Sequence, residues 1–355
     1  MTRRISTDSA TLLAGATALA LSACMPRPQP APLEPMGLLP GLVTKAQPEW
    51  IPFQVAAGAP LPADPREVRL GEPRAVDVGG EARRVVWSPD GQSLVVEVKR
   101  SDEPCEAAWQ VPLGGEAARR ISGPGTRARV GAFVGAERIV IGEAPCSEPI
   151  ATAKWTILEV DTSANRRRAI SRSDDELVGL TSDGAFTYFT SRNAARKYKL
   201  ARVPLAGGIP IDIGEACQPL DGPSVSSNDK MVFGCGDKDR AAQVRIGTSE
   251  GGVSTGWSSG GSNDVDAVLS ADGATVAFAS TRAKRQSNAM EGAFQIYAGR
   301  ASSMELHGTP AERVTFAGDN NRAPALGPNG RIAYLSDRAA PGGPLGVVVA
   351  RFDAP

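Results

Sequence analysis

The sequence contains a single histidine, His307, among its 355 residues. Histidine is a principal ligand of zinc and the usual general base beside a catalytic serine, so one copy excludes sites built on several histidines. A Ser-His-Asp triad would have to use His307, which lies in a loop-like Leu-His-Gly stretch. We expect a surface residue there, and we predict no catalytic residues, no metal and no cofactor.

An excess of charge of one sign is also missing. Lys and Arg together number 39, and Asp and Glu together number 39, which gives a formal net charge of zero. Proteins that neutralise the phosphates of nucleic acid need a basic excess. The balance therefore argues against a nucleic-acid partner.

The apolar run near the N-terminus is too short to cross a bilayer. It extends over residues 10–21, whereas a transmembrane helix needs roughly 20 apolar residues. Arg3 and Arg4 precede it, and Leu21-Ser22-Ala23-Cys24 follows at once. A positive segment, a short apolar run and small residues in this order are typical of a signal peptide.

The Leu-Ser-Ala-Cys tetrad resembles the lipobox of bacterial lipoproteins. The resemblance implies a signal peptide over residues 1–23 and a lipid on Cys24, the first residue of the mature chain. The alternative is an ordinary secretory signal with an accidental cysteine. Met25 stands where an Asp would resemble an inner-membrane retention signal, so we expect an outer-membrane anchor. Whether the body faces the periplasm or the exterior stays open.

Residues 24–64 are expected to form a tether. Seven prolines with few charges fall between residues 25 and 48, at positions 26, 28, 30, 32, 35, 40 and 48. Such segments favour an extended polyproline II conformation and act as semi-rigid spacers. The tether would hold the globular part away from the lipid.

The remaining chain, residues 65–355, has the composition of an all-β domain. Hydrophobic residues make up 41% of the sequence, enough for a full core, and there are 39 Gly and 28 Pro residues. This turn-rich level suits many short strands better than long helices.

A repeat runs through this region. Four turn-like copies share an Asp-Gly or Asn-Gly pair at Asp90 and Gly91, Asp183 and Gly184, Asp272 and Gly273, and Asn329 and Gly330. Two weaker copies lie between them, at residues 133–137 and 225–229. A β-rich run follows each copy, and such pairs supply the positive φ angles of a tight hairpin. A spacing in the forties between most copies predicts four-stranded propeller blades, six in all.

The Ser-Pro-Asp-Gly turn at residues 88–91, the strand that follows it, and the Ser-Asp-Arg ending at residues 336–338 resemble the WD40-like (PD40) repeat of TolB-type six-bladed propellers. The resemblance covers roughly residues 65–355 and leaves no room for the separate N-terminal domain of TolB. It implies an all-β six-bladed β-propeller. It says little about function, because such propellers serve as scaffolds, receptors and enzyme lids alike.

The last blade has only three strands in the sequence, the third being residues 345–352. We expect an N-terminal strand at residues 66–70 to pair beside it and close the ring, because closure removes exposed sheet edges.

Four cysteines remain in the body, and an even number in an oxidising compartment indicates disulfides. Three pairings are possible by count. The propeller frame places Cys105 and Cys146 in equivalent loops of adjacent blades, and Cys217 and Cys235 within blade four. We predict the pairs Cys105 with Cys146 and Cys217 with Cys235.

Several polar clusters have two interpretations. Ser227 and Lys230 form an S-x-x-K pattern, which we interpret as a solvated turn. Asn263, Asp264 and Asp266 could bind calcium but are expected to be an ordinary polar turn.

The basic stretches at residues 166–168, 192–199 and 282–285 are interpreted as a solvated rim, with contact to acidic partners or lipopolysaccharide phosphates as the alternative. The insertion at residues 284–294 is our interaction candidate.

Taken together, the sequence predicts a membrane-anchored lipoprotein whose propeller is a non-catalytic protein-binding scaffold of the bacterial cell envelope. Its partners would be envelope proteins bound through propeller loops, and the membrane through Cys24. The alternatives are a structural subunit of a larger outer-membrane or surface assembly, or a propeller that binds or cleaves glycans or peptides. The oligomeric state is not predicted.

Overall fold

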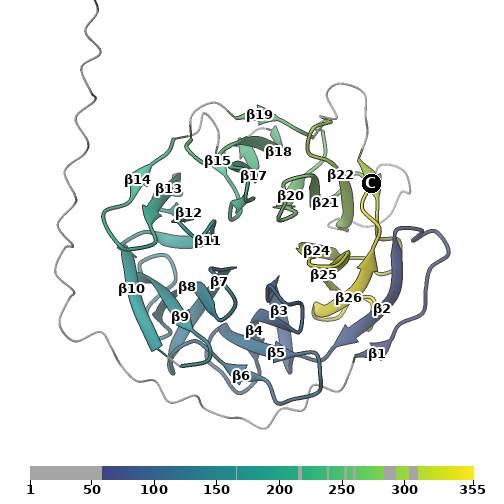
Figure 1. Ribbon diagram of the computed structural model, residues 1–355, viewed down its shortest axis with the longest axis horizontal. Coiled ribbons are helices and arrows are strands. Elements are labelled where there is room, and N and C mark those ends of the chain that lie inside the picture. The colour runs from purple at the N-terminus through teal and green to yellow at the C-terminus, as the bar shows by residue number, and fades with distance from the viewer. Residues whose placement is uncertain are drawn as a thin grey trace, which may run out of the picture. The chain divides into compact units, whose positions relative to one another are not determined.

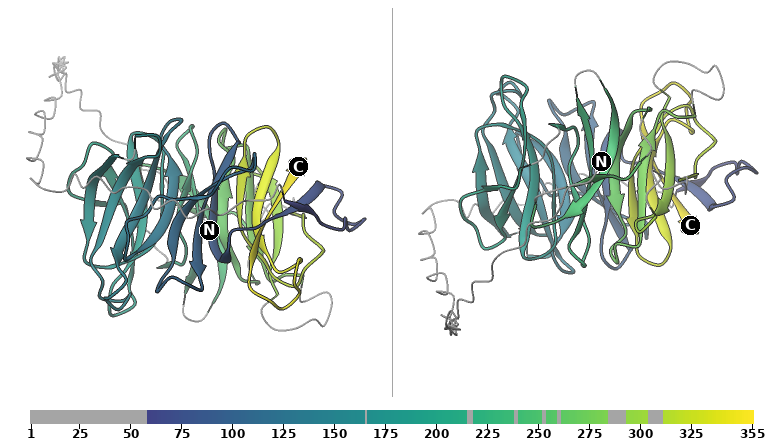
Figure 2. Two further views of the ribbon diagram at one scale, coloured as in Figure 1. Left: turned by 90° about the horizontal axis from the view of Figure 1, so that it is seen from below. Right: turned by 90° about the horizontal axis from the view of Figure 1, so that it is seen from above.

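The computed structural model describes residues 58–164, 166–214, 218–237, 240–251, 254–258, 261–283, 293–303 and 311–355. These residues form a six-bladed β-propeller, with six antiparallel sheets arranged in a ring and no helix in the described part of the chain (Figure 1). In the edge-on views the blades stand side by side, with their strands directed from one face of the ring to the other (Figure 2).

The first three blades have four strands each, taken in chain order. Blade 1 comprises β3 (Gly80–Trp87), β4 (Ser93–Arg100), β5 (Ala107–Pro112) and β6 (Arg119–Arg120). Blade 2 comprises β7 (Thr126–Phe133), β8 (Arg138–Pro145), β9 (Trp155–Asp161) and β10 (Arg166–Ser173). Blade 3 comprises β11 (Glu176–Ser182), β12 (Phe186–Arg192), β13 (Tyr198–Pro204) and β14 (Ile211–Asp212).

The last three blades depart from this scheme at blades 4 and 6. Blade 4 comprises β15 (Gln218–Pro219), β16 (Ser224–Val225), β17 (Lys230–Asp237), β18 (Arg240–Thr248) and β19 (Thr255–Gly256). Blade 5 comprises β20 (Asp264–Leu269), β21 (Thr275–Ser280), β22 (Gln295–Arg300) and β23 (Glu312–Arg313). Blade 6 comprises β24 (Asn321–Gly327), β25 (Arg331–Ser336), β26 (Gly346–Phe352), β2 (Leu70–Val76) and β1 (Ala59–Pro60).

Each predicted repeat turn is the hairpin between the first two strands of a blade. In blade 1 the main-chain N–H of Gly91 donates to the carbonyl of Ser88, and the Ser88 hydroxyl donates to the Asp90 carboxylate at 2.6 Å. This hydroxyl lowers the pKa of Asp90. Gly91 has a φ of +69°, the left-handed conformation that glycine adopts without a steric cost. The repeated motif is thus a turn signal.

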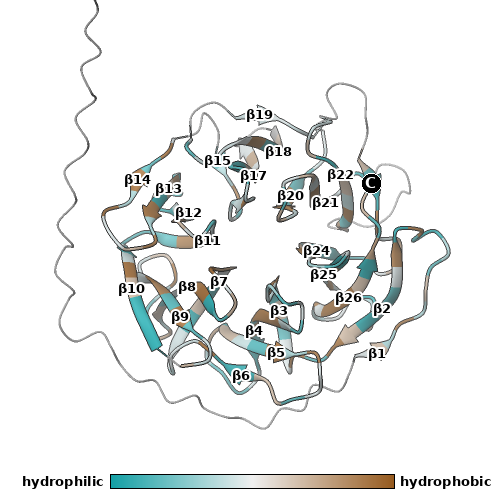
Figure 3. Ribbon diagram, in the orientation of Figure 1, coloured by the Kyte–Doolittle hydropathy of each residue, from teal (hydrophilic) through white to brown (hydrophobic). Residues whose placement is uncertain are grey.

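The second strands carry the core. Every residue of β21 is buried, and so are most residues of β4 and β12. Both faces of these strands are covered because blades pack face to face. The fully buried aromatic side chains Trp109, Trp155 and Trp257 add the largest apolar areas. Hydrophilic residues colour the outermost strand β6 and part of β10 (Figure 3).

The N-terminal strand closes the ring, but not with the predicted residues. Strand β2 pairs with β26 from Leu70 opposite Phe352 to Val76 opposite Val347. Most of the predicted strand, residues 66–70, is a turn instead, because the N–H of Glu67 bonds back to the carbonyl of Asp64. Strand β1 adds a fifth strand to the blade and begins before residue 65.

The segment before β2 is fastened by a buried ion pair. The Glu67 carboxylate lies 3.0 Å from the Arg338 guanidinium, and both side chains are 2% exposed. Glu67 also accepts hydrogen bonds from the main-chain N–H groups of Phe316 and Ala317, and Arg338 donates to the carbonyl of Pro62 at 2.6 Å. We call Glu67 and Arg338 the closure pair.

Arg338 explains the Ser-Asp-Arg ending at residues 336–338. An arginine at the end of the second strand, or two residues after it, also pairs with an acid in blades 3 and 5: Arg192 with Glu176, the first residue of β11, and Arg282 with Asp264, the first residue of β20. In each of these blades the arginine neutralises a buried carboxylate. Arginine suits it because its planar fork can bind a carboxylate through several N–H groups.

Candidate functional site

The first strands of the six blades line the centre of the ring. Each contacts the first strands of both neighbouring blades, in the order β3, β7, β11, β16, β20 and β24. Five of them, all except that of blade 4, carry a β-bulge that shifts the pairing with the second strand. Bulges bend a strand and re-aim its side chains, often next to functional sites.

Blade 4 has a larger interruption at the corresponding place. Its first strand is divided into β15 and β16 by residues 220–223, which include Asp221. Both pieces pair with β17. All six first strands are therefore irregular where they face the centre.

Charged side chains gather at these irregular places. We call them the ring-centre cluster, and they are Arg84, Glu97, Arg129, Asp221, Asp266 and Arg322. Glu97 comes from β4, and the other five come from the first strands of blades 1, 2, 4, 5 and 6 or from the interruption in blade 4. Blade 3 contributes main-chain carbonyl groups instead of a charge.

Arg129 links the first three blades. Its guanidinium pairs with the buried Glu97 carboxylate of blade 1. Its Nε donates to the carbonyl of Leu177 in blade 3 at 3.3 Å. The guanidinium also lies over the Trp155 ring, 5.5 Å from the centroid. The position of Arg129 is thus fixed on three sides.

Asp221, Asp266 and Arg322 link the other three blades. The Asp221 carboxylate accepts from the N–H of Gly234 at 2.7 Å and from the N–H of Asp266. The Asp266 carboxylate in turn accepts from Arg322 Nε at 3.0 Å and from the N–H of Ala323. Asp266 and Ala323 have positive φ angles of 54° and 45°, so backbone strain accompanies this arrangement.

Arg84 extends across the ring from blade 1. Its Nη2 donates to the carbonyl of Leu180 in blade 3 at 3.4 Å. Its Nη1 would lie 2.7 Å from a Cβ added at Gly179 and 2.5 Å from one added at Gly222. The guanidinium therefore rests against two glycines, one in blade 3 and one in blade 4, and any larger residue there would displace it.

The charges of the cluster shift one another's proton affinities. Burial raises the pKa of Asp221 to about 7, and the nearby Asp266 carboxylate adds to the rise. Burial also lowers the pKa of Arg84, against the opposing effect of Glu97, Asp221 and Asp266. Arg84 remains charged because guanidinium groups do not lose their proton in proteins. Asp221 thus titrates near neutral pH.

The sequence did not single out most of these residues, although a signal exists. A charged residue stands six to eight positions before the turn marker in every repeat. In five blades it belongs to the ring-centre cluster, as Arg84, Arg129, Asp221, Asp266 or Arg322. In blade 3 it is Glu176, which pairs with Arg192 of the same blade instead. A charge within an otherwise β-forming run indicates an unusual environment, and the repeat makes it recognisable.

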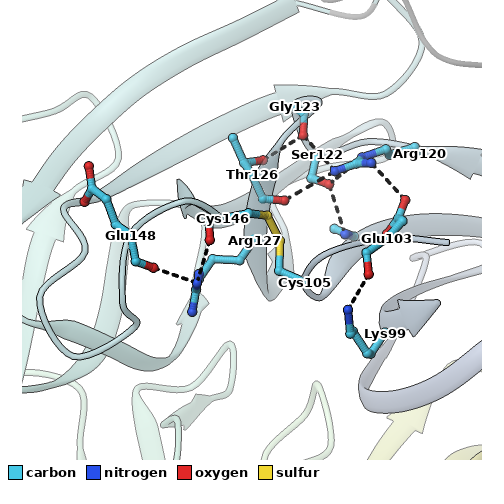
Figure 4. The surroundings of a disulfide bond; sticks show 11 residues. Lys99, Glu103, Cys105, Arg120, Ser122, Gly123, Thr126, Arg127, Cys146 and Glu148 are labelled. Atoms are coloured by element: carbon cyan, nitrogen blue, oxygen red, sulfur yellow. Dashed lines mark hydrogen bonds and ion pairs between the residues drawn. A yellow bond between two sulfur atoms is a disulfide. The ribbon is translucent and has the colours of Figure 1, made fainter. Parts of the chain in front are cut away.

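The predicted disulfide between Cys105 and Cys146 is present. It joins the loops that follow β4 and β8 in adjacent blades, with a Cα–Cα distance of 5.9 Å (Figure 4). Beside it, Arg120 pairs with Glu103, and Arg127 donates to the carbonyl groups of Cys146 and Glu148. The disulfide is part of a polar seam between blades 1 and 2.

Several predicted residues lie outside the described part of the chain. They are Cys24, Cys217, His307 and residues 284–292, which make up most of the insertion predicted at residues 284–294. The lipid anchor and the pairing of Cys217 with Cys235 therefore stay predictions, and so does the interaction role of the insertion.

The basic stretches are not simply a solvated rim. Arg167 is buried and pairs through both terminal nitrogens with Glu143, while Arg168 pairs with Glu159. Arg282 is paired with Asp264, as described above. These arginines hold strands and blades together, which leaves fewer of them for external acidic partners than the sequence suggested.

One polar cluster differs from the prediction. Asp264 and Asp266 lie in strand β20 and not in a polar turn, because each has an arginine partner that offsets the cost of removing its carboxylate from water. No cluster of three or more potential metal ligands occurs among the described residues. Ser227 lies in the predicted hairpin turn and Lys230 begins β17.

The Ser227 hydroxyl donates to the carbonyl of Ala271 in the next blade, so the turns of blades 4 and 5 are in contact. A cleft of about 400 Å³ lies at this contact, lined by Lys230, Asp272 and Arg300 among others. In the described residues, no helix has the length and apolar character of a membrane span.

The chain matches no known protein family and no curated protein. Many solved structures share its fold. TolB from Acinetobacter baumannii superimposes with a TM-score of 0.51 at 13% identity, over 78% of this chain and 65% of that one. This chain thus spans less than two thirds of that TolB. At such identity the likeness shows the fold alone, which is the TolB-like six-bladed propeller predicted from the repeats.

Two further structures are similar but superimpose less well. A putative TolB from Agrobacterium tumefaciens has a TM-score of 0.40 at 17% identity, over 74% of this chain and 73% of that one. An acylaminoacyl peptidase from Pyrococcus horikoshii has a TM-score of 0.49 at 12% identity, over 78% of this chain and 46% of that one.

Proposed function

We propose that the protein is a bacterial envelope lipoprotein, anchored to a membrane through Cys24, whose propeller binds another protein and performs no catalysis. The ring-centre cluster carries the binding part of the proposal. It brings together charged groups from five blades and carbonyl groups from the sixth, held on strands of a rigid scaffold. Pre-organised groups on rigid elements are what a specific binding site requires.

A protein partner suits this cluster better than a neutral glycan does. The cluster contains three cations, Arg84, Arg129 and Arg322, and three acids, Glu97, Asp221 and Asp266. A protein surface carries charges of both signs, and complementary charge gives specificity and fast association. The TolB-like fold is consistent with a scaffold of this kind.

Anchoring rests on the N-terminal sequence. The lipobox at residues 21–24 and the proline-rich segment at residues 25–48 together imply a propeller held at a distance from the membrane. Several acyl chains on one residue give stable attachment, because each buried CH₂ contributes about 0.8 kcal/mol. The outer membrane is the proposed location.

Crosslinking in intact cells, followed by mass spectrometry of the co-purified proteins, tests the binding role. We expect one reproducible envelope partner, and we expect Arg322→Gln at the ring centre to reduce its capture at least fivefold. The matched control is Arg166→Gln, an exposed arginine on the outer strand β10. Equal capture by both variants would contradict the assigned site.

Two further results would contradict the rest of the proposal. Cys24→Ala is expected to move the protein from the membrane fraction to the soluble fraction, and continued membrane association would refute the lipid anchor. If nothing is captured, and the purified protein instead cleaves members of a glycan or peptide library, the protein is an enzyme. A partner that stays bound through purification at high salt would indicate a permanent subunit.

A further inference from the structure

Arg84 differs from the other two arginines of the ring-centre cluster. Arg129 is paired with Glu97, and Arg322 is paired with Asp266 at 3.0 Å. Arg84 has no carboxylate within 4 Å among the described residues, although Glu97, Asp221 and Asp266 all influence it electrostatically. The two oxygens of Asp221 are already occupied by main-chain N–H groups.

The donors of Arg84 are largely unused. A guanidinium has five N–H groups, and in the described chain Arg84 makes one hydrogen bond, a long one of 3.4 Å to the carbonyl of Leu180. The residue is only partly buried, so solvent reaches it. A partly desolvated guanidinium with free donors gains from an anionic ligand, since bonds between charged groups are about twice as strong as neutral ones.

The structure also holds Arg84 in place without using those donors. Gly179 and Gly222 lie against its guanidinium, so closely that an added Cβ would meet Nη1 at 2.7 and 2.5 Å. The bulge at Arg83 turns Arg84 toward the centre, opposite Glu97 in the strand pairing. The side chain is thus positioned by packing while its N–H groups stay available.

The local charge decides which anion fits. Three arginines and three acids give a net charge of zero when every acid is ionised, and of +1 when Asp221 is protonated, which its pKa of about 7 allows near neutral pH. A ligand with one negative charge balances the protonated state. The carboxyl groups of Glu97 and Asp266 would oppose a phosphate, with nearly two negative charges, about twice as strongly as a ligand with one.

We propose that Arg84 recognises a carboxylate of the bound partner, either an Asp or Glu side chain or a free C-terminal carboxylate, at the centre of the ring. The inference rests on the proposed binding function and names the chemistry of its partner. An arginine binds a carboxylate through two parallel N–H bonds, a geometry that lysine cannot reproduce.

Small carboxylates test this without the partner. NMR would follow the Nε–Hε resonance of Arg84 in the full-length protein during titration with four probes. Two are carboxylates: N-acetylglycinate mimics a C-terminus, and the primary amide of N-acetylglutamate mimics a Glu side chain. The other two are the uncharged N-acetylglycinamide and inorganic phosphate. We expect saturable shifts with one or both carboxylates, at least tenfold weaker binding of phosphate, and no saturation with the uncharged amide.

Variants complete the test. Arg84→Gln and Arg84→Lys should each weaken carboxylate binding at least tenfold, measured by the shifts of neighbouring main-chain amides. Arg83→Gln is the matched control, because Arg83 is the exposed neighbour in the same bulge and pairs with Glu81 at the surface. A thermal melt within a few degrees of wild type would show that the variants fold.

The outcomes separate the two proposals. If the amide probe binds as well as the carboxylates, or if Arg84→Gln binds them as well as wild type, the inference is wrong. In that case a captured envelope partner would still support the proposed function. If no partner is captured but Arg84 binds carboxylates selectively, the subsite stands and the proposed protein-binding role does not.

Discussion

The closure pair and the ring-centre cluster use the same kinds of residue for different purposes. Glu67 and Arg338 are 2% exposed, lie 3.0 Å apart and have further partners in Phe316, Ala317 and Pro62. At the ring centre, by contrast, Arg84 is partly exposed and has no acid within ion-pair distance in the described residues.

The difference shows how one fold separates structural charges from recognition charges. A buried charge without a partner is costly, and the buried carboxylates Glu67, Glu143 and Asp264 each have an arginine partner. A partly exposed charge can remain unpaired, since water replaces the partner until a ligand arrives. An arginine without an acidic partner, such as Arg84, therefore keeps N–H donors free for a ligand, whereas a fully buried pair such as Glu67 and Arg338 stabilises the ring.

Breaking the closure pair should have the largest effect. Arg338→Met leaves the buried Glu67 carboxylate without its counter-charge, and we expect the free energy of unfolding to fall by about 3–5 kcal/mol. Arg83→Met is the control, because the Arg83–Glu81 pair is exposed and should contribute less than about 1 kcal/mol. Urea denaturation of both variants measures the difference, and equal losses would contradict the distinction.

Removing the disulfide should come next. The double variant Cys105→Ala with Cys146→Ala releases a crosslink between residues 41 positions apart, and we expect a loss of about 2–4 kcal/mol in the free energy of unfolding. Ser147→Ala, an exposed neighbour, should change nothing measurable. If the double variant unfolds at the wild-type urea concentration, the bridge does not stabilise the seam between blades 1 and 2.

Asp221 should make stability depend on pH. Its pKa is about 7 in the folded protein and about 3.9 when unfolded, so between these values the folded state binds the extra proton. Stability is then lost as pH rises, by about 2–3 kcal/mol from pH 5 to pH 7.

Asp221→Asn should remove this contribution to the pH dependence of stability. The measurement is the free energy of unfolding of wild type and of the variant at a series of pH values. Curves of the same slope for wild type and Asp221→Asn would mean that Asp221 is ionised throughout.

The repeat turns should show the smallest effects. Gly184 and Gly273 both have positive φ angles, 92° and 65°, so alanine at either position is strained by about 1 kcal/mol. A Cβ at Gly184 meets nothing, whereas a Cβ at Gly273 would lie 2.4 Å from Oδ1 of Asn228 in the neighbouring blade. Gly273→Ala should therefore lower the free energy of unfolding by about 1 kcal/mol more than Gly184→Ala does, measured by thermal unfolding. Equal losses in the two variants would mean that the turns of blades 4 and 5 do not stabilise each other.

The all-β fold and the blade count could be read from the sequence because both depend on local features. Asp-Gly and Asn-Gly pairs define hairpins, and the strands that follow them are buried on both faces. The pairing of Cys105 with Cys146 followed from the repeat frame, since equivalent loops of neighbouring blades come close. The closing strand was placed several residues too early because Pro65 and the Asp64 turn delay its start.

The ring-centre cluster could not be read in the same way. Asp264 and Asp266 looked like a polar turn, since two carboxylates in six residues rarely form a buried strand. Each is stabilised there by an arginine that lies 18 or 56 residues away in the chain. No local pattern contains those partners.

The sequence by itself determined the repeat, the turns, the strands and the N-terminal lipobox, because each depends on residues a few positions apart. Only the tertiary structure decided which arginines are paired and which remain open. Closing six blades into a ring brings residues from all of them to one centre, and it places Arg84 of blade 1 against Gly179 and Gly222 of blades 3 and 4. This contact depends on how far apart the blades lie across the ring, and no single stretch of the sequence contains that information.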